Sequence, residues 1–234
     1  MDITHDISSS TLKILAIICM TANHAGYIFE DVLPTWAFVT CIVIGGATFP
    51  IMAFLITEGY RRTSDVRRYA LRLLIFAFIA QAPFWFFLAE CGNVLFTLLI
   101  GLMLVYLDHT LENRALFAIA VVAGCALSIF CDWPIIGPAA VLFFDRLRDR
   151  EHGTAIACWI IAACVVVSAL PLDLSTNLPL YAAGAAGGVF GGIVTSLLLP
   201  RYQGKRGLPL KYFFYIYYPA HIAVLGFIHM AMMG

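Results

Sequence analysis

Lys13 and His24 are the two residues whose types and spacing could together perform chemistry inside a membrane. Both belong to the apolar stretch LKILAIICMTANHAGYIF, which is long enough to cross a bilayer. Eleven positions are about three α-helical turns, so both side chains project from one helix face, with a rise of roughly 16 Å between them. Because a polar group held in lipid is costly and commonly functional, we expect the function to centre on His24.

Both residues also have a structural interpretation. Lys13 could be an anchor whose long side chain reaches the lipid headgroups. His24 could form a hydrogen bond between packed helices, and Asn23 beside it could serve the same purpose. A histidine next to an asparagine inside an apolar stretch favours the functional interpretation.

The composition predicts a membrane protein. Hydrophobic residues make up 62% of the 234 residues and charged residues only 12%, with a mean hydropathy of +0.92. A soluble domain of this length would carry about twice that charge. We predict an all-α, polytopic integral membrane helix bundle that forms one domain over residues 1–234. The first apolar stretch has no signal-peptide cleavage site, so we expect it to be a retained helix.

Nine apolar segments are predicted as membrane spans. They cover residues 12–30, 36–60, 70–89, 93–107, 115–131, 134–145, 154–171, 178–199 and 213–232. The third to sixth are short or interrupted by Pro83, Pro134 and Pro138, so some must bend or borrow flanking residues. The pair 115–131 and 134–145 could instead be a single hairpin-like or re-entrant element.

The positive charges support this count. With the N-terminus in the cytoplasm, the inside segments are residues 1–13, 61–72, 108–114, 146–153 and 200–212. These segments hold all 14 lysines and arginines, whereas the opposite loops carry acids such as Glu90 and Asp132 and no cation. This distribution follows the positive-inside rule and places the C-terminus outside.

Two basic loops are candidate phosphate sites. The candidate cations are Arg61, Arg68 and Arg72 in the first loop, and Lys205, Arg206 and Lys211 in the second. A guanidinium group matches phosphate oxygens in a bidentate manner. Anionic lipid headgroups would attract the same charges, and charge alone does not separate the two interpretations. The second loop contains GKRG but lacks the P-loop pattern GxxxxGK[ST], so ATP use is unsupported.

Further polar residues could line a cavity with His24. The candidates are Asn93, Thr97, Tyr215, Tyr218 and His221. Asn93 and Thr97 share a helix face, and Asn93 or the tyrosines could stabilise a developing oxyanion. Ordinary interhelical hydrogen bonds are the alternative.

Small residues and cysteines predict packing features. Gly184, Gly188 and Gly192 are four positions apart and predict a close-packing helix face, and Gly45 with Gly46 allows a similar approach. Pro50 is expected to bend the second span. Cys91 and Cys131 both fall near the outer surface, where a disulfide could form. The cysteines show no metal-ligand spacing, so we expect no metal.

Several motifs together resemble the TraX family, named for the conjugation protein associated with N-terminal acetylation of F pilin. The matching pieces are LKILAIICMTANHAGYIF, FPIMAFLITEGYRRT, RRYALRLLIFAFIAQAPF, NVLFTLLIGL, and GKRG followed by KYFFYIYYPAH. They run in the family's order over nearly the whole chain. The family is similar to transmembrane acyltransferases that commonly begin with a basic residue, ten intervening positions and a histidine. Lys13 and His24 match that spacing.

The resemblance implies an acetyl-CoA-dependent acyltransferase of the bacterial cytoplasmic (inner) membrane. Cytoplasmic acetyl-CoA would be the co-substrate, with Lys13 among the cations that hold it. The acceptor would be an amine or hydroxyl of a protein N-terminus, glycan, lipid or small molecule. His24 would be the general base or would briefly carry the acetyl group. TraX relatives usually have Asp before this histidine, whereas Asn23 can only orient it.

Two other functions stay open. In a small transporter or channel, His24, Asn93 and His221 would line a path, although no convincing internal duplication supports this. An inactive family member could serve as an assembly subunit. The expected partners are acetyl-CoA, the acyl acceptor and membrane lipids, without nucleic acid, and formation of a homo-oligomer is left open.

Overall fold

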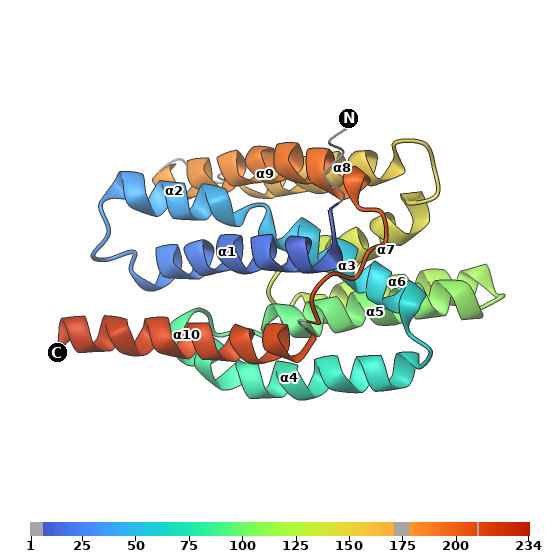
Figure 1. Ribbon diagram of the computed structural model, residues 1–234, viewed down its shortest axis with the longest axis horizontal. Coiled ribbons are helices and arrows are strands. Elements are labelled where there is room, and N and C mark those ends of the chain that lie inside the picture. The colour runs from blue at the N-terminus through green and yellow to red at the C-terminus, as the bar shows by residue number, and fades with distance from the viewer. Residues whose placement is uncertain (1–6, 171–177, 210) are drawn as a thin grey trace. The chain divides into compact units, whose positions relative to one another are not determined.

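The computed structural model describes residues 7–170, 178–209 and 211–234, which form ten α-helices and one short 3-10 helix (Figure 1). The elements are α1 (Ser9–Ile28), α2 (Thr35–Gly45), α3 (Thr48–Arg62), α4 (Val66–Phe87), α5 (Val94–Thr110), α6 (Arg114–Ser128), α7 (Ile136–Leu147), α8 (Gly153–Ser168), α9 (Leu178–Leu198), η1 (Leu199–Arg201) and α10 (Lys211–Met233). Strand-like pairing in these residues is limited to two isolated bridges. The all-α prediction is confirmed.

Each of the nine predicted segments corresponds to helix, with the second divided into α2 and α3. Five stretches are long and apolar enough to cross a membrane: Ser9–Ile28, Thr35–Arg62, Val66–Phe87, Pro179–Arg201 and Tyr212–Met233. Helices α5, α6 and α8 are apolar but have only 17, 15 and 16 residues, and α7 has 12. The number of crossings and the orientation therefore stay predictions.

The prolines interrupt fewer helices than the sequence suggested. Pro83 lies inside the 22-residue helix α4, so the expected interruption there is wrong. Membrane helices tolerate such a proline because neighbouring groups can satisfy the freed carbonyl. Pro138 is the third residue of α7, where no helical N–H bond is lost. Helices α6 and α7 are separate and packed together, so the pair is a helical hairpin.

The chain divides into two compact units. The first consists of Met1–Met52 and Arg150–Phe214, and the second of Ala53–Asp149 and Tyr215–Gly234. In the first unit α1 packs on α2, α2 on α9 and α9 on α8; in the second, α5 packs on α4, α6 and α7. The single domain over residues 1–234 stays a prediction.

Two glycine faces of α9 let its neighbours approach closely. A Cβ atom built on Gly188 would lie 3.0 Å from Val165, and one on Gly192 would lie 2.7 Å from the Cβ of Ala162 in α8. At Gly184 the nearest atom, in Ala169, is 3.4 Å away, which is an ordinary contact. The predicted close-packing face is therefore confirmed and is tightest at Gly188 and Gly192.

The second face of α9 meets α2 backbone against backbone. A Cβ atom on Gly191 would collide with the carbonyl group of Gly46, and one on Gly46 would collide with the carbonyl group of Gly187. Neither carbonyl can move away as the end of a flexible side chain could. The approach of α2 to α9 in the first unit therefore depends on glycine at these positions.

Replacing Gly46 with alanine should lower the free energy of unfolding by about 1–3 kcal/mol, because the added methyl group overpacks a backbone contact. Thermal unfolding of the protein in detergent micelles measures this effect. The matched control is Gly184→Ala, which adds a methyl group at ordinary contact distance from Ala169 and should be neutral or slightly stabilising. Equal stability of the two variants would contradict the packing of α2 on α9.

The apolar stretch Thr35–Arg62 is broken between α2 and α3. Two short-range bonds tighten the end of α2: Gly46 N–H donates to the Val43 carbonyl at 3.1 Å, and Ala47 N–H to the Ile44 carbonyl at 3.4 Å. The sequence predicted a bend at Pro50. The structure instead places the break before this proline, which is the third residue of α3 and needs no helical donor there.

Candidate functional site

His24 is a buried residue of α1, and its neighbour Asn23 packs directly on α2. A Cβ atom added to Gly45 would lie 2.5 Å from the Cβ of Asn23 and would collide with its amide nitrogen. The absence of a side chain at Gly45 therefore makes room for the Asn23 amide. Because α2 holds Asn23 in place, the backbone position of His24 is fixed relative to both helices.

The GKRG loop is fastened to the start of α1. The first N–H groups of a helix lack intrahelical partners, and here the loop supplies them. Ser9 N–H donates to the Lys205 carbonyl at 2.8 Å, and Ser10 N–H to the Arg206 carbonyl at 3.2 Å. In return, the Ser10 hydroxyl accepts from the N–H of Leu208 at 3.1 Å. The loop and the helix therefore form one hydrogen-bonded unit.

Gly207 allows this close approach. Its φ is +65°, a region that favours glycine, and an added Cβ would lie 2.7 Å from the Ser8 hydroxyl oxygen. The Lys205 and Arg206 side chains are exposed, and Lys13 is partly exposed one turn into α1. Three of the predicted phosphate-binding cations, from distant parts of the sequence, thus gather at one end of the helix that carries His24.

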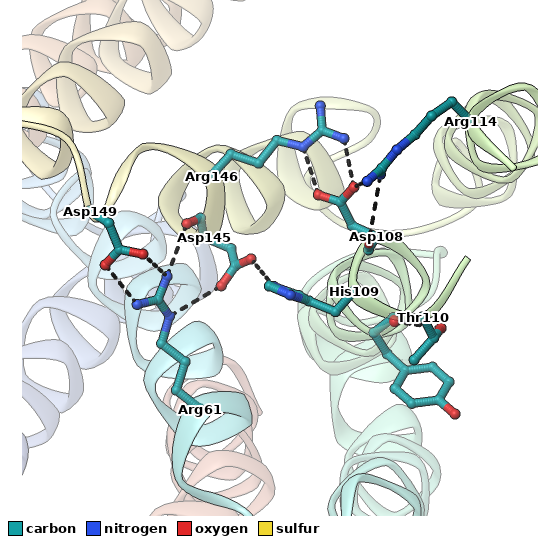
Figure 2. A network of polar contacts seen from close by, with 9 residues as sticks. Arg61, Asp108, His109, Thr110, Arg114, Asp145, Arg146 and Asp149 are labelled. Atoms are coloured by element: carbon teal, nitrogen blue, oxygen red, sulfur yellow. Dashed lines mark hydrogen bonds and ion pairs between the residues drawn. The ribbon is translucent and has the colours of Figure 1, made fainter. Parts of the chain in front are cut away.

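The arginines of the first basic loop behave differently. Arg61 donates to Asp149 at 3.0 and 3.2 Å, and to the side chain and carbonyl of Asp145 at 3.3 and 3.2 Å (Figure 2). The same hydrogen bonding lowers the pKa of Asp149 below its ordinary value. The Arg61 guanidinium is therefore engaged by the protein itself, and the geometry gives its predicted role in binding acetyl-CoA no support.

Arg68 and Arg72 do not join that network. Arg68 forms an exposed pair at 3.0 Å with Asp65, the residue that caps α4. The Arg72 guanidinium lies 5.6 Å from the centre of the Tyr69 ring, and its Nε is buried with no hydrogen-bond partner in the described part of the chain. Lys211 is the first residue of α10, and its side chain lies outside what the structure describes. Ligand binding by these three residues stays a prediction.

Asn93 and Thr97 hold helices together in the second unit. The Asn93 amide donates to the Ala77 carbonyl at 2.7 Å and to Gln81 at 2.9 Å, while its oxygen caps α5 by accepting from Leu95 N–H. The Thr97 hydroxyl donates to the Asp132 carbonyl. These bonds fit the interhelical alternative considered for both residues.

The three candidates on α10 pack against aromatic rings. Tyr215 stacks on Phe76 with ring centres 4.8 Å apart, and Tyr218 is buried. His221 stacks on Tyr217 and donates from Nδ1 to its carbonyl at 2.8 Å. All three belong to the second unit and His24 to the first, so a cavity that they share stays a prediction.

Comparison with known proteins settles the family. A family model described as TraX protein matches residues 8–229. This chain belongs to the TraX family. The resemblance inferred from the motifs is thereby confirmed. The chain is also 28% identical over 242 residues to the probable fimbrial assembly protein FimC, serogroup H1, of Dichelobacter nodosus, with 94% of this chain and 95% of that protein covered. No solved structure matches the chain significantly.

In this TraX-family chain, sequence reasoning missed an ion-pair network at one end of the second unit. His109 Nε2 lies 2.7 Å from the buried carboxylate of Asp145, and Asp108 binds Arg146 at 2.7 Å and Arg114 at 2.9 Å (Figure 2). Together with Arg61, these contacts bring the ends of α3, α5 and α7 and the start of α6 together. Residues of the predicted inside segments 61–72, 108–114 and 146–153 therefore meet in this network, through Arg61, Asp108 and Arg146.

The signal for this network was the alternation of charge in Asp108-His109 and in DRLRD over residues 145–149. A search for cations alone does not reveal the acids that pair with them.

Within the described ranges of this TraX-family chain, no three His, Cys, Asp or Glu side chains gather as metal ligands would. The expectation that no metal is used stays a prediction.

Cys91 and Cys131 are free thiols. The disulfide that their loop positions allowed is therefore not formed. The backbones of the two loops are joined instead by hydrogen bonds from Gly92 N–H to the Phe130 carbonyl at 2.8 Å and from Asp132 N–H to the Gly92 carbonyl at 2.6 Å. This pairing brings the Cys131 sulfur close to Gly92, where an added Cβ atom would lie 2.9 Å from it.

Proposed function

We propose that this TraX-family protein is an integral membrane acetyltransferase that moves an acetyl group from cytoplasmic acetyl-CoA to an amine or hydroxyl acceptor. One observation carries the proposal: the basic GKRG loop is hydrogen-bonded to the start of α1, and buried His24 lies further along the same helix. A cationic end and a candidate proton acceptor are thus built on one rigid element.

The cations at the start of α1 suit the phosphates of coenzyme A. Lys205 and Arg206 are exposed on a loop whose backbone is fixed, so their charges are presented without ordering the loop on binding. Charge-assisted hydrogen bonds to phosphate are stronger than neutral ones. Lys13 and His24 are separated by a helical rise of roughly 16 Å. The flexible pantetheine arm would cover this distance and carry the thioester toward the imidazole.

His24 would serve as general base or as a transient acetyl carrier. A neutral imidazole can take the proton that an amine or hydroxyl loses as it attacks the thioester carbonyl. Asn23 packs on Gly45 and can orient groups near His24 by hydrogen bonding, but it supplies no negative charge. The proposed histidine therefore works without the carboxylate that TraX relatives usually place beside it.

A pilin-type or fimbrial subunit with a free N-terminal amine is the acceptor to test first. The family takes its name from a protein associated with pilin acetylation, and the relative from Dichelobacter nodosus is named for fimbrial assembly. The same proposal places the chain in the bacterial cytoplasmic membrane as a multi-pass protein, with the GKRG loop in the cytoplasm.

The double substitution of Lys205 and Arg206 with alanine should raise the KM for acetyl-CoA about tenfold or more, because two charge-assisted phosphate contacts are lost. The kcat should change little. The measurement is transfer of labelled acetyl to a peptide with a free N-terminal amine, with an N-terminally blocked peptide as the negative control.

Arg150→Ala is the matched control, since Arg150 is an exposed cation of the same unit outside the GKRG loop. Its KM should equal that of the unmodified protein. An unchanged KM in the double variant would move the donor site elsewhere. Absence of transfer by the unmodified protein to amine and hydroxyl acceptors alike would reject the enzyme itself.

A further inference from the structure

The break between α2 and α3 follows Gly45, the residue that packs on Asn23, the chain neighbour of His24. Helices α1 and α2 lie side by side and run in opposite directions (Figure 1). An added Cβ on Gly26 would lie 2.9 Å from the Cβ of Cys41 and 3.2 Å from the Cδ1 of Ile42, and one on Gly45, the last residue of α2, would collide with Asn23. Thr48 follows Gly45 by only three residues, so α3 begins close in the chain to the residue that Asn23 contacts.

A break at this place needs an explanation. Backbone polar groups cannot be left unsatisfied against lipid, so irregular backbone at membrane depth is tolerated where protein buries it or where it lines a cavity. Discontinuous membrane helices commonly form binding sites for this reason. Here the break comes after Gly45, in an apolar stretch of 28 residues, and the Gly187 and Gly191 backbone of α9 closes one side of it.

Thr48, the first residue of α3, carries a polar group that the protein does not use. Its hydroxyl oxygen is buried and has no hydrogen-bond partner among the described residues. Other threonine hydroxyls in the helices donate to carbonyls one turn back, at 2.7 Å for Thr21, 2.7 Å for Thr40 and 2.6 Å for Thr195. At Thr48 the preceding turn is not helical, so the break removes that ordinary acceptor.

We propose that the Thr48 hydroxyl is a further catalytic group, which donates a hydrogen bond to the carbonyl oxygen of the acetyl thioester. This inference rests on the proposed acetyltransferase function. The N-terminus of the 15-residue helix α3 lies at the same place, and its dipole favours negative charge there. A fixed donor aimed at a developing oxyanion in a water-poor site is among the most effective means of lowering a reaction barrier.

The acceptor nitrogen or oxygen forms a bond to the carbonyl carbon, and the π electrons move to the carbonyl oxygen, which Thr48 stabilises. His24 takes the proton from the attacking atom. When the tetrahedral intermediate collapses, the carbon–sulfur bond breaks and the sulfur leaves with the electron pair. The sulfur then receives the proton from His24, so the products are the acetylated acceptor and coenzyme A thiol.

The test is Thr48→Val, which keeps the shape of the side chain and removes the hydroxyl. In the full-length protein in lipid nanodiscs, kcat for acetyl transfer should fall about 100-fold, the loss typical of one oxyanion donor. Thr48→Ser, which keeps the donor, should retain most of the activity. Thermal stability of Thr48→Val should not fall, because the lost hydroxyl made no bond in the protein. A purely structural role predicts no such combination of lower activity with retained stability.

Thr40→Val is the matched control, since its hydroxyl lies in α2 and donates to the Trp36 carbonyl. A second readout is the infrared stretch of bound acetyl-CoA labelled with ¹³C at the thioester carbonyl. The hydrogen bond should lower this frequency in the unmodified protein relative to Thr48→Val. Equal frequencies, or activity of Thr48→Val equal to that of Thr40→Val, would overturn the role of Thr48 while the enzyme itself stands. Failure of the unmodified protein to bind acetyl-CoA would overturn both.

Discussion

Replacing His24 with alanine is expected to lower kcat for acetyl transfer by about 10²–10⁴-fold, the range typical for loss of a general base. The KM for acetyl-CoA should change little, because the proposed phosphate contacts lie at the start of α1, about three turns away. The measurement is steady-state transfer of labelled acetyl to an amine acceptor by purified protein. Because an alanine leaves a cavity at a buried position, correct folding is checked by thermal unfolding.

His24→Gln is the second variant for this prediction. Glutamine keeps a polar side chain of similar reach but cannot accept a proton at neutral pH, so it should be as inactive as alanine while filling more of the space. A cation control, Arg150→Ala, should be fully active. Normal acetylation by folded His24→Gln would remove the central role of His24 and leave the TraX family assignment intact.

The helices and the charged ends followed from sequence because both depend on local information. Apolar runs such as the one around His24 are long enough to identify, and cations mark their ends. The attachment of the GKRG loop to α1 could not be read in this way. It depends on bonds such as that between Leu208 and Ser10, which are 198 positions apart. The sequence predicted that Lys13 and Lys205 lie on one side of the membrane, and the structure adds that both lie at the start of α1.

Polar residues inside the helices were harder to interpret. The i, i+4 spacing predicted a shared helix face for Asn93 and Thr97, but this spacing does not distinguish a cavity lining from a helix cap. The difference is decided by partners on other elements, namely Gln81 and Asp132. The break before Thr48 was signalled by Gly45, Gly46 and Pro50. The position of the break depends on contacts with the backbone of α9, and the local sequence around the break does not reveal these contacts.

Arg61 shows why charge alone could not assign the phosphate site. From sequence alone Arg61 and Lys205 are equivalent candidates, because both are cations of predicted inside loops. In the structure the two acids at the end of α7 engage Arg61, whereas the Lys205 side chain is exposed. A cation can be assigned to a phosphate ligand only once the acids near it are known, because nearby acids can already engage it.

The same network gives the second large prediction. Replacing Asp145 with asparagine should lower the free energy of unfolding by about 3 kcal/mol, at the lower end of the range for breaking a buried ion pair. The Asp145 side chain is only 3% exposed and pairs with both Arg61 and His109. The lower end applies because those partners are 30% and 51% exposed, so water can relieve part of their loss.

Asp149→Asn is the matched control, because Asp149 binds the same guanidinium from a side chain that is 81% exposed. Its loss should cost at most about 1 kcal/mol, as for other surface pairs. Since Arg61 lowers the pKa of Asp149, this small contribution is present above the ordinary pKa of aspartate and disappears as pH falls through the lowered value. Unfolding of both variants in detergent at neutral pH tests the contrast. Equal losses would mean that burial does not distinguish the two acids, and that Asp145 does not organise the ends of α3, α5 and α7.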